Sequence, residues 1–236
     1  VWSKKIGGPP AGMNRCCQIF LWGLVAGILP SCATSHAGSP NLLAQPDAWT
    51  IEAENPSATV AFSGGTVEID TPQGLSLWLR KPLVAPVEIS FEAMPVAEGG
   101  PNDAVSDLNA FWMATNADGS DVLSHPRNGS FAQYDTMRAY YVGIGGNRNT
   151  TTRFRRYVGE AGNRPLLPQH DLSGTENGLK PNVWTRIVLA VDGNAVSVRR
   201  DGSELFKLDD PSPYNRGHFA LRTTKSHLRI RNLTVN

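Results

Sequence analysis

The sequence predicts an all-β domain in which two antiparallel sheets pack into a sandwich, and three observations support this prediction. Turn signals recur at short intervals, in FSGG, TPQG, AEGGPND, NADGSD, GIGGN, VDGN and RDGSE, and they separate brief apolar or alternating runs. No amphipathic stretch of about ten residues carries helix caps. No unit of about 20–50 residues repeats, which argues against propellers and solenoids.

The first 37 residues indicate an upstream extension followed by an export signal. Arg15 supplies positive charge, and CCQIFLWGLVAGILP supplies an apolar core shorter than the ~20 residues of a membrane-spanning helix. The tetrapeptide LPSC at 29–32 resembles the lipobox of bacterial lipoproteins, which would make Cys32 the lipidated first residue; the alternative is ordinary cleavage after Ala37. We therefore expect a bacterial protein that is secreted, or a periplasmic or outer-membrane lipoprotein touching the membrane only through an N-terminal lipid anchor.

Cysteine usage and charge limit the chemistry of the remaining chain. All three cysteines, Cys16, Cys17 and Cys32, lie in or at the end of the export segment, so zinc-thiolate sites and cysteine nucleophiles are excluded from the mature domain. Residues 38–47 are expected to be a linker, and residues 48–236 a single domain that is large enough to bury a full core. The net charge of +1 predicts no nucleic-acid partner.

The C-terminal stretch has the clearest strand pattern. VWTRIVLAVDGNAVSVRRDGSELF alternates apolar and polar residues around Asp192-Gly193 and Asp201-Gly202, which predicts two hairpins in series. GHFALRTTKSHLRIRNLTVN then predicts a closing pair of strands. From residue 182 onward this order resembles the concanavalin-like and laminin-G-like jelly rolls. The resemblance implies two antiparallel sheets, one of them concave, with ligands usually bound on the concave face.

Alternation along the predicted strands places aromatic and arginine side chains on one outward face. If Phe154 points inward, its neighbours Arg153 and Arg155 point outward, because successive side chains of a strand take opposite faces. In YYVGIGGN the inward set is Tyr140, Val142 and Ile144, so the glycines that alternate with them face outward and leave room for a ligand near the backbone. The same reasoning gives an outward set of Trp112, Tyr141, Arg153, Arg155, Tyr157 and Arg222.

The charge of this region predicts an anionic ligand. Residues 127–171 contain seven arginines, three acidic residues and no lysine. Planar, bidentate arginine suits carboxylate or sulfate. Aromatic rings suit the C–H faces of sugars, and Asn147 and Asn149 supply hydrogen bonds, so an acidic polysaccharide or oligosaccharide is the expected partner.

A family resemblance points the same way. RNGSFAQYDTMRAYYVGIGGNRNTTTRFRRY, RPLLPQHDL and PYNRGHFALRTTKSH resemble a family of secreted bacterial domains of unknown function. That family is similar to jelly-roll proteins of pectin and rhamnogalacturonan utilisation clusters. The resemblance runs from about Asn109 to the C-terminus and implies a role in polysaccharide breakdown outside the cytoplasm.

Three functions are compatible with these residues: a polysaccharide lyase is the leading prediction, non-catalytic binding of an acidic glycan is the alternative, and a glycosidase is third. A polysaccharide lyase, acting by β-elimination on a uronate, needs a group that neutralises the carboxylate, a base and an acid. A non-catalytic glycan-binding protein needs the same arginines without a base, and a glycosidase needs paired carboxylates. The catalytic candidates are Tyr157, His170, Arg153 and Arg155, with a tyrosinate favoured by the nearby arginines; the substrate-binding candidates are Trp112, Arg127, Tyr141, Asn147, Asn149, Arg222 and His227.

Structural roles are the alternative for each of these residues. Arginines on strands are often exposed and paired with acids across the sheet. Trp112 and Tyr141 also suit core or rim positions, and His170 suits a loop capped by Asp171. No cofactor is expected; Asp118 and Asp121 in NADGSD are compatible with a structural calcium site or with plain turn chemistry.

Overall fold

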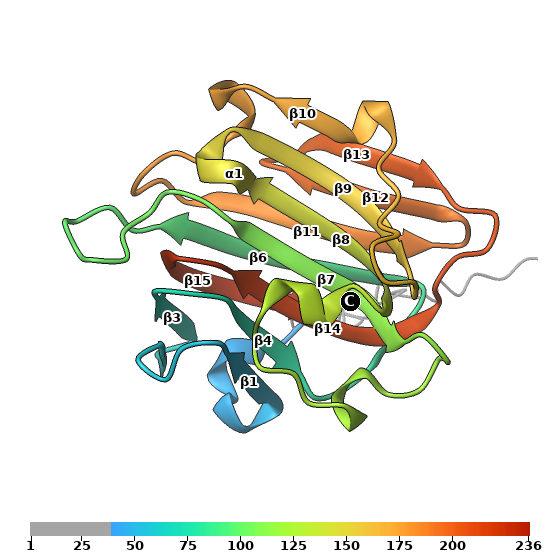
Figure 1. Ribbon diagram of the computed structural model, residues 1–236, viewed down its shortest axis with the longest axis horizontal. Coiled ribbons are helices and arrows are strands. Elements are labelled where there is room, and N and C mark those ends of the chain that lie inside the picture. The colour runs from blue at the N-terminus through green and yellow to red at the C-terminus, as the bar shows by residue number, and fades with distance from the viewer. Residues whose placement is uncertain (1–38) are drawn as a thin grey trace, which may run out of the picture. The chain divides into compact units, whose positions relative to one another are not determined.

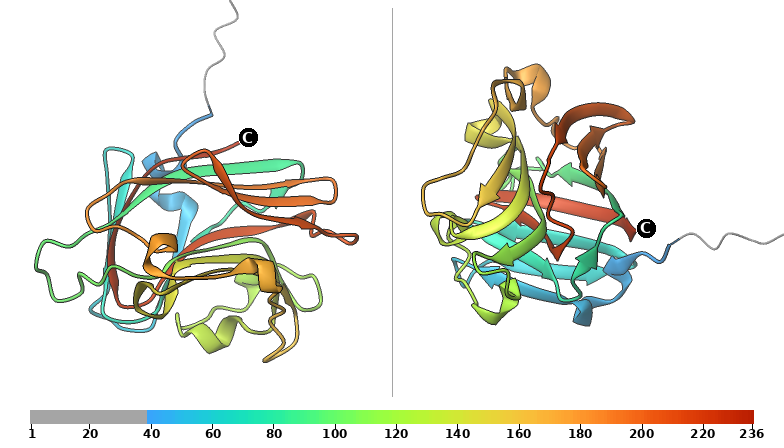
Figure 2. Two further views of the ribbon diagram at one scale, coloured as in Figure 1. Left: turned by 90° about the horizontal axis from the view of Figure 1, so that it is seen from above. Right: turned by 90° about the vertical axis from the view of Figure 1, so that its right-hand side faces the viewer.

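The computed structural model describes residues 39–236, and the predicted export segment lies outside them. In these residues fifteen strands form two antiparallel sheets that pack face to face (Figures 1 and 2). The predicted all-β, jelly-roll-like sandwich is therefore confirmed. No helix among the described residues is long and apolar enough to cross a membrane.

The first sheet, sheet A, carries the face that matters for function. Its strands, in spatial order, are β1 (Trp49–Ala53), β4 (Leu75–Leu79), β14 (Arg216–Thr223), β7 (Leu108–Asn116), β8 (Met137–Gly145), β9 (Thr151–Val158) and β10 (Asp171–Ser173), with β5 (Leu83–Val84) paired to β14.

The second sheet, sheet B, contains the hairpins that the C-terminal sequence predicts. Its strands, in spatial order, are β13 (Ser203–Asp209), β12 (Ala195–Arg200), β11 (Thr185–Asp192), β6 (Val87–Pro95), β15 (Ser226–Val235), β3 (Thr66–Thr71) and β2 (Thr59–Ser63). The Asp-Gly turns connect β11 to β12 and β12 to β13, as expected, because Gly193, Asp201 and Gly202 all adopt positive φ.

Helical structure in the described residues is limited to short turns. They are η1 (Leu42–Ala44), η2 (Pro46–Ala48), η3 (Val122–Ser124), η4 (Phe131–Tyr134), η5 (Pro168–His170) and η6 (Thr175–Asn177), together with the turn α1 (Gly146–Asn149).

The stretch expected to be a linker is part of the packed domain. Residues 41–48 form two 3₁₀ turns, and Leu43 is buried in the core. The Asn41 side chain donates to the carbonyl of Gly65 at 2.7 Å and accepts from the backbone N–H of Leu233 at 3.2 Å. Here the structure differs from the sequence expectation, because these tertiary contacts order a polar, proline-containing segment.

Two separate apolar clusters stabilise the domain. The larger lies between the sheets and includes Tyr140, Val142 and Phe154, the set that alternation places inward. The smaller lies on the outer face of sheet A and includes Trp78 and Phe111. The connection between β7 and β8, residues 117–136, packs over this second cluster; we call it the covering loop.

Candidate functional site

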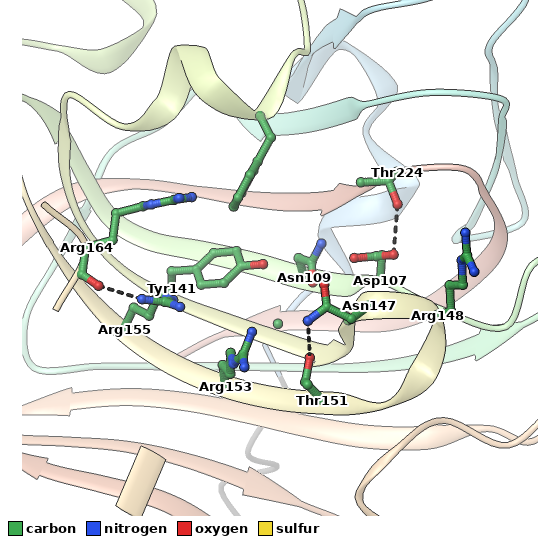
Figure 3. A pocket seen from close by; sticks show the side chains of 13 residues that line it. Asp107, Asn109, Tyr141, Asn147, Arg148, Thr151, Arg153, Arg155, Arg164 and Thr224 are labelled. Atoms are coloured by element: carbon green, nitrogen blue, oxygen red, sulfur yellow. Dashed lines mark hydrogen bonds between the residues drawn. The ribbon is translucent and has the colours of Figure 1, made fainter. Parts of the chain in front are cut away.

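A pocket of about 440 Å³ opens on the outer face of sheet A, beside the turn that joins β8 to β9 (Figure 3). Most of the residues that line it are polar, and they come from three strands and from connections on either side. The lining residues are Asp107, Asn109, Phe131, Tyr141, Gly143, Gly146, Asn147, Arg148, Thr151, Arg153, Arg155, Arg164 and Thr224.

The turn α1 brings polar side chains to the pocket rim. Asn147, Arg148 and Asn149 all have φ between 52° and 64°, the left-handed region that asparagine tolerates best among non-glycine residues. The Asn149 side chain accepts from the backbone N–H of Leu179 at 2.7 Å and donates to its carbonyl at 2.9 Å. Asn149 therefore anchors the turn, while the exposed Asn147 and Arg148 lie at the pocket.

Four arginines surround the pocket, but they differ in their partners. Arg153 forms an ion pair with Asp171, Nε to Oδ1 at 2.7 Å, and the Arg164 Nε lies 3.4 Å from Asp135 Oδ1. Arg155 donates from Nη1 to the carbonyl of Arg164 at 2.6 Å. Within residues 39–236, Arg155 and Arg148 form no ion pair with a carboxylate.

Two positive charges in the pocket, those of Arg148 and Arg155, are therefore not neutralised by an ion pair within the described residues. Burial lowers the pKa of Arg155, but an arginine side chain keeps its charge at physiological pH. Asp107 is the carboxylate in the lining, and its Oδ2 accepts from the hydroxyls of Ser106 and Thr224 at 2.8 Å each. Arg148 and Arg155 remain available for an anion.

Tyr141 and Asn109 form an uncharged polar part of the pocket wall. Both lie over Gly143, where an added Cβ would be 2.5 Å from the Tyr141 hydroxyl and 2.9 Å from Asn109 Oδ1. Glycine is thus required for the two side chains to lie along the sheet. Asn109 is only 2% exposed, and its Oδ1 has no hydrogen-bond partner among the described residues. Burial raises the pKa of Tyr141 strongly.

The structure brings together four of the predicted site residues, namely Tyr141, Asn147, Arg153 and Arg155. It contradicts the outward placement of Trp112, which is fully buried between the sheets, with its ring 5.5 Å from that of Tyr140. The predicted phase of this strand was wrong, because Leu108, Ala110 and Trp112 alternate regularly into the inner core. The β-bulge between Trp112 and Thr115 then allows Met113 to join the inner core as well. Phe111, not Trp112, shares the outer face with Tyr141.

Both candidates for a catalytic base are also misplaced. Tyr157 lies on the predicted face but is fully buried, and this burial raises its pKa, contrary to the expected tyrosinate. His170 is 3% exposed, packs on Phe154 at 4.8 Å in the inner core, and its Nε2 lies 2.9 Å from the carbonyl of Lys207. Neither side chain lines the pocket.

Three predicted substrate-binding residues have structural roles instead. Arg127 donates to the backbone carbonyls of Val122, His125 and Gln133 and so holds the covering loop together. Arg222 is 1% exposed beneath that loop and donates to the carbonyl of Gly129 at 3.1 Å. His227 lies on β15 of sheet B, between Asp103 and Glu68.

Sequence reasoning missed several lining residues. Arg148 and Arg164 belong to the arginine-rich region, but only the fold shows that they reach the pocket. Asp107 and Thr224 come from connections that are far apart in the sequence, and no local signal joins them. Asn109 was missed because alternation counted from Trp112 has the wrong phase.

The loop around Asp118 and Asp121 shows turn chemistry. Asp118 Oδ1 accepts from the backbone N–H of Ser120 at 2.9 Å, and Asp121 Oδ1 accepts from that of Leu123 at 2.8 Å. Across the described part of the chain, no group of three or more His, Cys, Asp or Glu side chains is arranged to hold a metal ion.

Similar folds occur in solved structures of low sequence identity. A Bacillus subtilis protein of unknown function with a galectin-like fold has a TM-score of 0.62 at 14% identity, covering 83% of this chain and 93% of that chain. The carbohydrate-binding module CBM66 from Bacillus subtilis has a TM-score of 0.54 at 10% identity, covering 80% and 95%. The exoplasmic/lumenal domain of VIP36, in a Ca²⁺/Man-bound form, has a TM-score of 0.53 at 11% identity, covering 80% and 82%.

Sequence comparison gives the family. No curated protein matches the chain. The family DUF6250, described as a domain of unknown function, matches residues 69–233, well over half of the sequence, and this protein therefore belongs to the DUF6250 family.

Proposed function

We propose that this domain binds an acidic, uronate-bearing glycan in the pocket on the outer face of sheet A, without catalysing its cleavage. Two proteins of similar fold support a carbohydrate ligand by what their names state, a carbohydrate-binding module and a domain with bound Man. The hydroxyl and amide groups of Tyr141, Asn147 and Thr151 suit the hydroxyl groups of a sugar.

The observation that carries the proposal is the pair of arginines without acidic partners in the described residues, Arg148 and Arg155. Guanidinium groups bind carboxylates through charge-assisted and often bidentate hydrogen bonds. Arg153 and Arg164 already have carboxylate partners, so Arg148 and Arg155, on opposite sides of the pocket (Figure 3), are the residues that would bind acidic groups of the glycan.

Binding is favoured over β-elimination because the pocket lacks a suitable base. Tyr157 and His170 are buried outside it, and the pKa of Tyr141 is raised by burial, which disfavours the tyrosinate that proton removal requires. A lyase is the second candidate. The positive charge of Arg155 lowers the pKa of Tyr141 in part, and this favours the tyrosinate that a lyase could use as its base. A glycosidase is disfavoured because Asp107 is the single carboxylate among the lining residues.

The cellular setting we propose is outside the cytoplasm, in pectin or rhamnogalacturonan breakdown. It rests on the export segment at residues 1–37 and on the family resemblance described above. Fractionation of cells that express the full chain, with Cys32→Ser as the variant that cannot be lipidated, would test the anchor.

Calorimetric titration of the mature domain with polygalacturonate, alginate and glucuronan, beside neutral dextran, tests the function. We expect at least one acidic polymer to bind and dextran to bind weakly. Loss of one charge-assisted hydrogen bond costs about 1.5–3 kcal/mol. Arg148→Ala combined with Arg155→Ala should therefore weaken the affinity by at least about tenfold.

Arg216→Ala combined with Lys207→Ala is the matched control for charge, because both side chains are exposed and neither lines the pocket. Unchanged affinity in the Arg148→Ala, Arg155→Ala variant would overturn the proposal. Absorbance from newly formed unsaturated uronates in the same mixtures would instead establish the lyase.

A further inference from the structure

The covering loop packs over the side of sheet A that carries β1, β4 and β14. It leaves β7, crosses the sheet and reaches the edge strand β1, where the Tyr134 hydroxyl donates to Glu52 Oε2 and the Arg127 backbone N–H donates to Glu52 Oε1, each at 2.7 Å. A Cβ on Gly129 would lie 2.6 Å from the backbone nitrogen of Glu54. Figure 1 shows the loop in front of β4 and β14.

This loop is packed as tightly as a core element. Tyr134 and Val122 are fully buried, and the Tyr134 ring lies 5.6 Å from Phe111 and 6.2 Å from Trp78. The buried Arg222 adds a hydrogen bond to the loop backbone at Gly129. The part of the outer face that lies under this loop, at Glu52, Trp78 and Arg222, is therefore closed to a ligand.

Two side chains, Phe131 and Arg164, separate this closed region from the pocket, and we call them the wall. Phe131 of the covering loop and Arg164 of the connection after β9 both line the pocket, and the Arg164 guanidinium lies 5.2 Å from the Phe131 ring. The Arg164 carbonyl also holds Arg155. On the opposite side of the pocket stand Arg148 and Thr224 (Figure 3).

We propose that the pocket recognises the end of an acidic glycan chain and not an internal segment; this inference rests on the proposed function. An internal segment needs a groove that is open on two sides, whereas the wall at Phe131 and Arg164 stops a chain from continuing across the sheet. The volume of about 440 Å³ is near the lower end of the ~300–1,000 Å³ range of ligand pockets. It suits a terminal unit better than a long stretch of polymer.

The polar lining agrees with a chain end. A terminal sugar carries a free hydroxyl where an internal sugar carries a glycosidic bond. Asp107 is a carboxylate acceptor in the lining, on the side of the pocket where Arg148 lies (Figure 3). A terminal uronate would thus place its carboxylate on Arg155 and donate its additional hydroxyl toward Asp107.

Binding stoichiometry tests the inference. The mature domain is titrated with a short and a long fraction of whichever of polygalacturonate, alginate and glucuronan binds. We expect one molecule of protein per chain for both fractions. Reduction of the reducing end to an alditol, or conversion of the non-reducing end to the unsaturated uronate, should weaken the affinity by about tenfold or more for one of the two ends.

The other outcomes separate the two proposals. If the number of proteins per chain rises with length and neither end modification changes Kd, while the Arg148→Ala, Arg155→Ala variant still loses binding, end recognition is overturned and the proposed function stands. If no acidic polymer binds, or if the double variant binds normally, the proposed function fails and this inference fails with it.

Discussion

Arg153 and Asp171 are directly paired across β9 and β10, and their side chains form an ion pair with Nε and Oδ1 2.7 Å apart. β10 is an edge strand of sheet A, so the carboxylate lies at the border of the pocket. Asp171 thereby neutralises one of the arginines that the sequence assigns to a ligand.

Asp171→Asn is expected to strengthen the binding of an acidic glycan, because it frees Arg153 for the ligand carboxylate. Both side chains are about one-third exposed, so the gain should be modest, about two- to fivefold. Calorimetry at low ionic strength measures it. Asp192→Asn, an equal change of charge at an exposed position of sheet B, is the control, and an equal gain there would mean that only net charge matters.

Tyr141→Phe should weaken sugar binding by about five- to tenfold, the cost of one neutral hydrogen bond of ~1 kcal/mol. Its effect on the free energy of unfolding should be small, because the hydroxyl forms no hydrogen bond with the described residues, while the ring keeps its contacts with Phe111 and Phe131. Titration and urea unfolding of the same variant measure both effects. An unchanged affinity would remove Tyr141 from the site.

Gly217→Ala should destabilise the domain by about 1–3 kcal/mol or more, because the new methyl group would overpack against backbone. Its Cβ would lie 2.2 Å from the carbonyl carbon of Met113, at the β-bulge of β7. Gly146→Ala is the control for unfolding, since its Cβ would meet nothing closer than a side-chain oxygen of Thr151 at 3.1 Å. Equal stability of the two variants would contradict the close approach at the bulge.

The environment of His227 should make the free energy of unfolding depend on pH. Burial lowers its pKa, but hydrogen bonds to Asp103 and Glu68 raise it by more, so that the pKa is raised overall. A histidine with a raised folded-state pKa stabilises the protein fully below its unfolded value of about 6.5, and this contribution is lost as the pH rises through the folded-state pKa.

The free energy of unfolding should therefore fall as the pH increases above about 6.5. Urea unfolding at several pH values measures it, with His227→Gln as the variant in which this decrease should be absent. The same decrease in the variant would assign the effect to other groups. On the acid side, backbone hydrogen bonds hold the pKa of Asp103 at about 2, so its contribution is fully present above its ordinary pKa of 3.8 and is lost as the pH falls from there to about 2.

Local sequence determined much of the fold. The Asp-Gly turns at residues 192–193 and 201–202 lie where the hairpins of sheet B reverse, because their backbone conformation depends on the residues of the turn alone. Alternation along β8 and β9 correctly separated Tyr140 and Phe154, in the inner core, from Tyr141 and Arg155 on the outer face. Regular strands allow this inference because their side chains alternate without interruption.

Only the tertiary structure decided which of the outward residues meet a ligand. Packing between the sheets decided which phase of β7 faces the core and so buried Trp112, and the outer apolar cluster under the covering loop buried Tyr157 and Arg222 on the face that alternation had assigned to them. Asp171 reached Arg153 through the pairing of β10 with β9. Each outcome depends on contacts between segments distant in the chain, and side-chain periodicity within one strand carries no information about them.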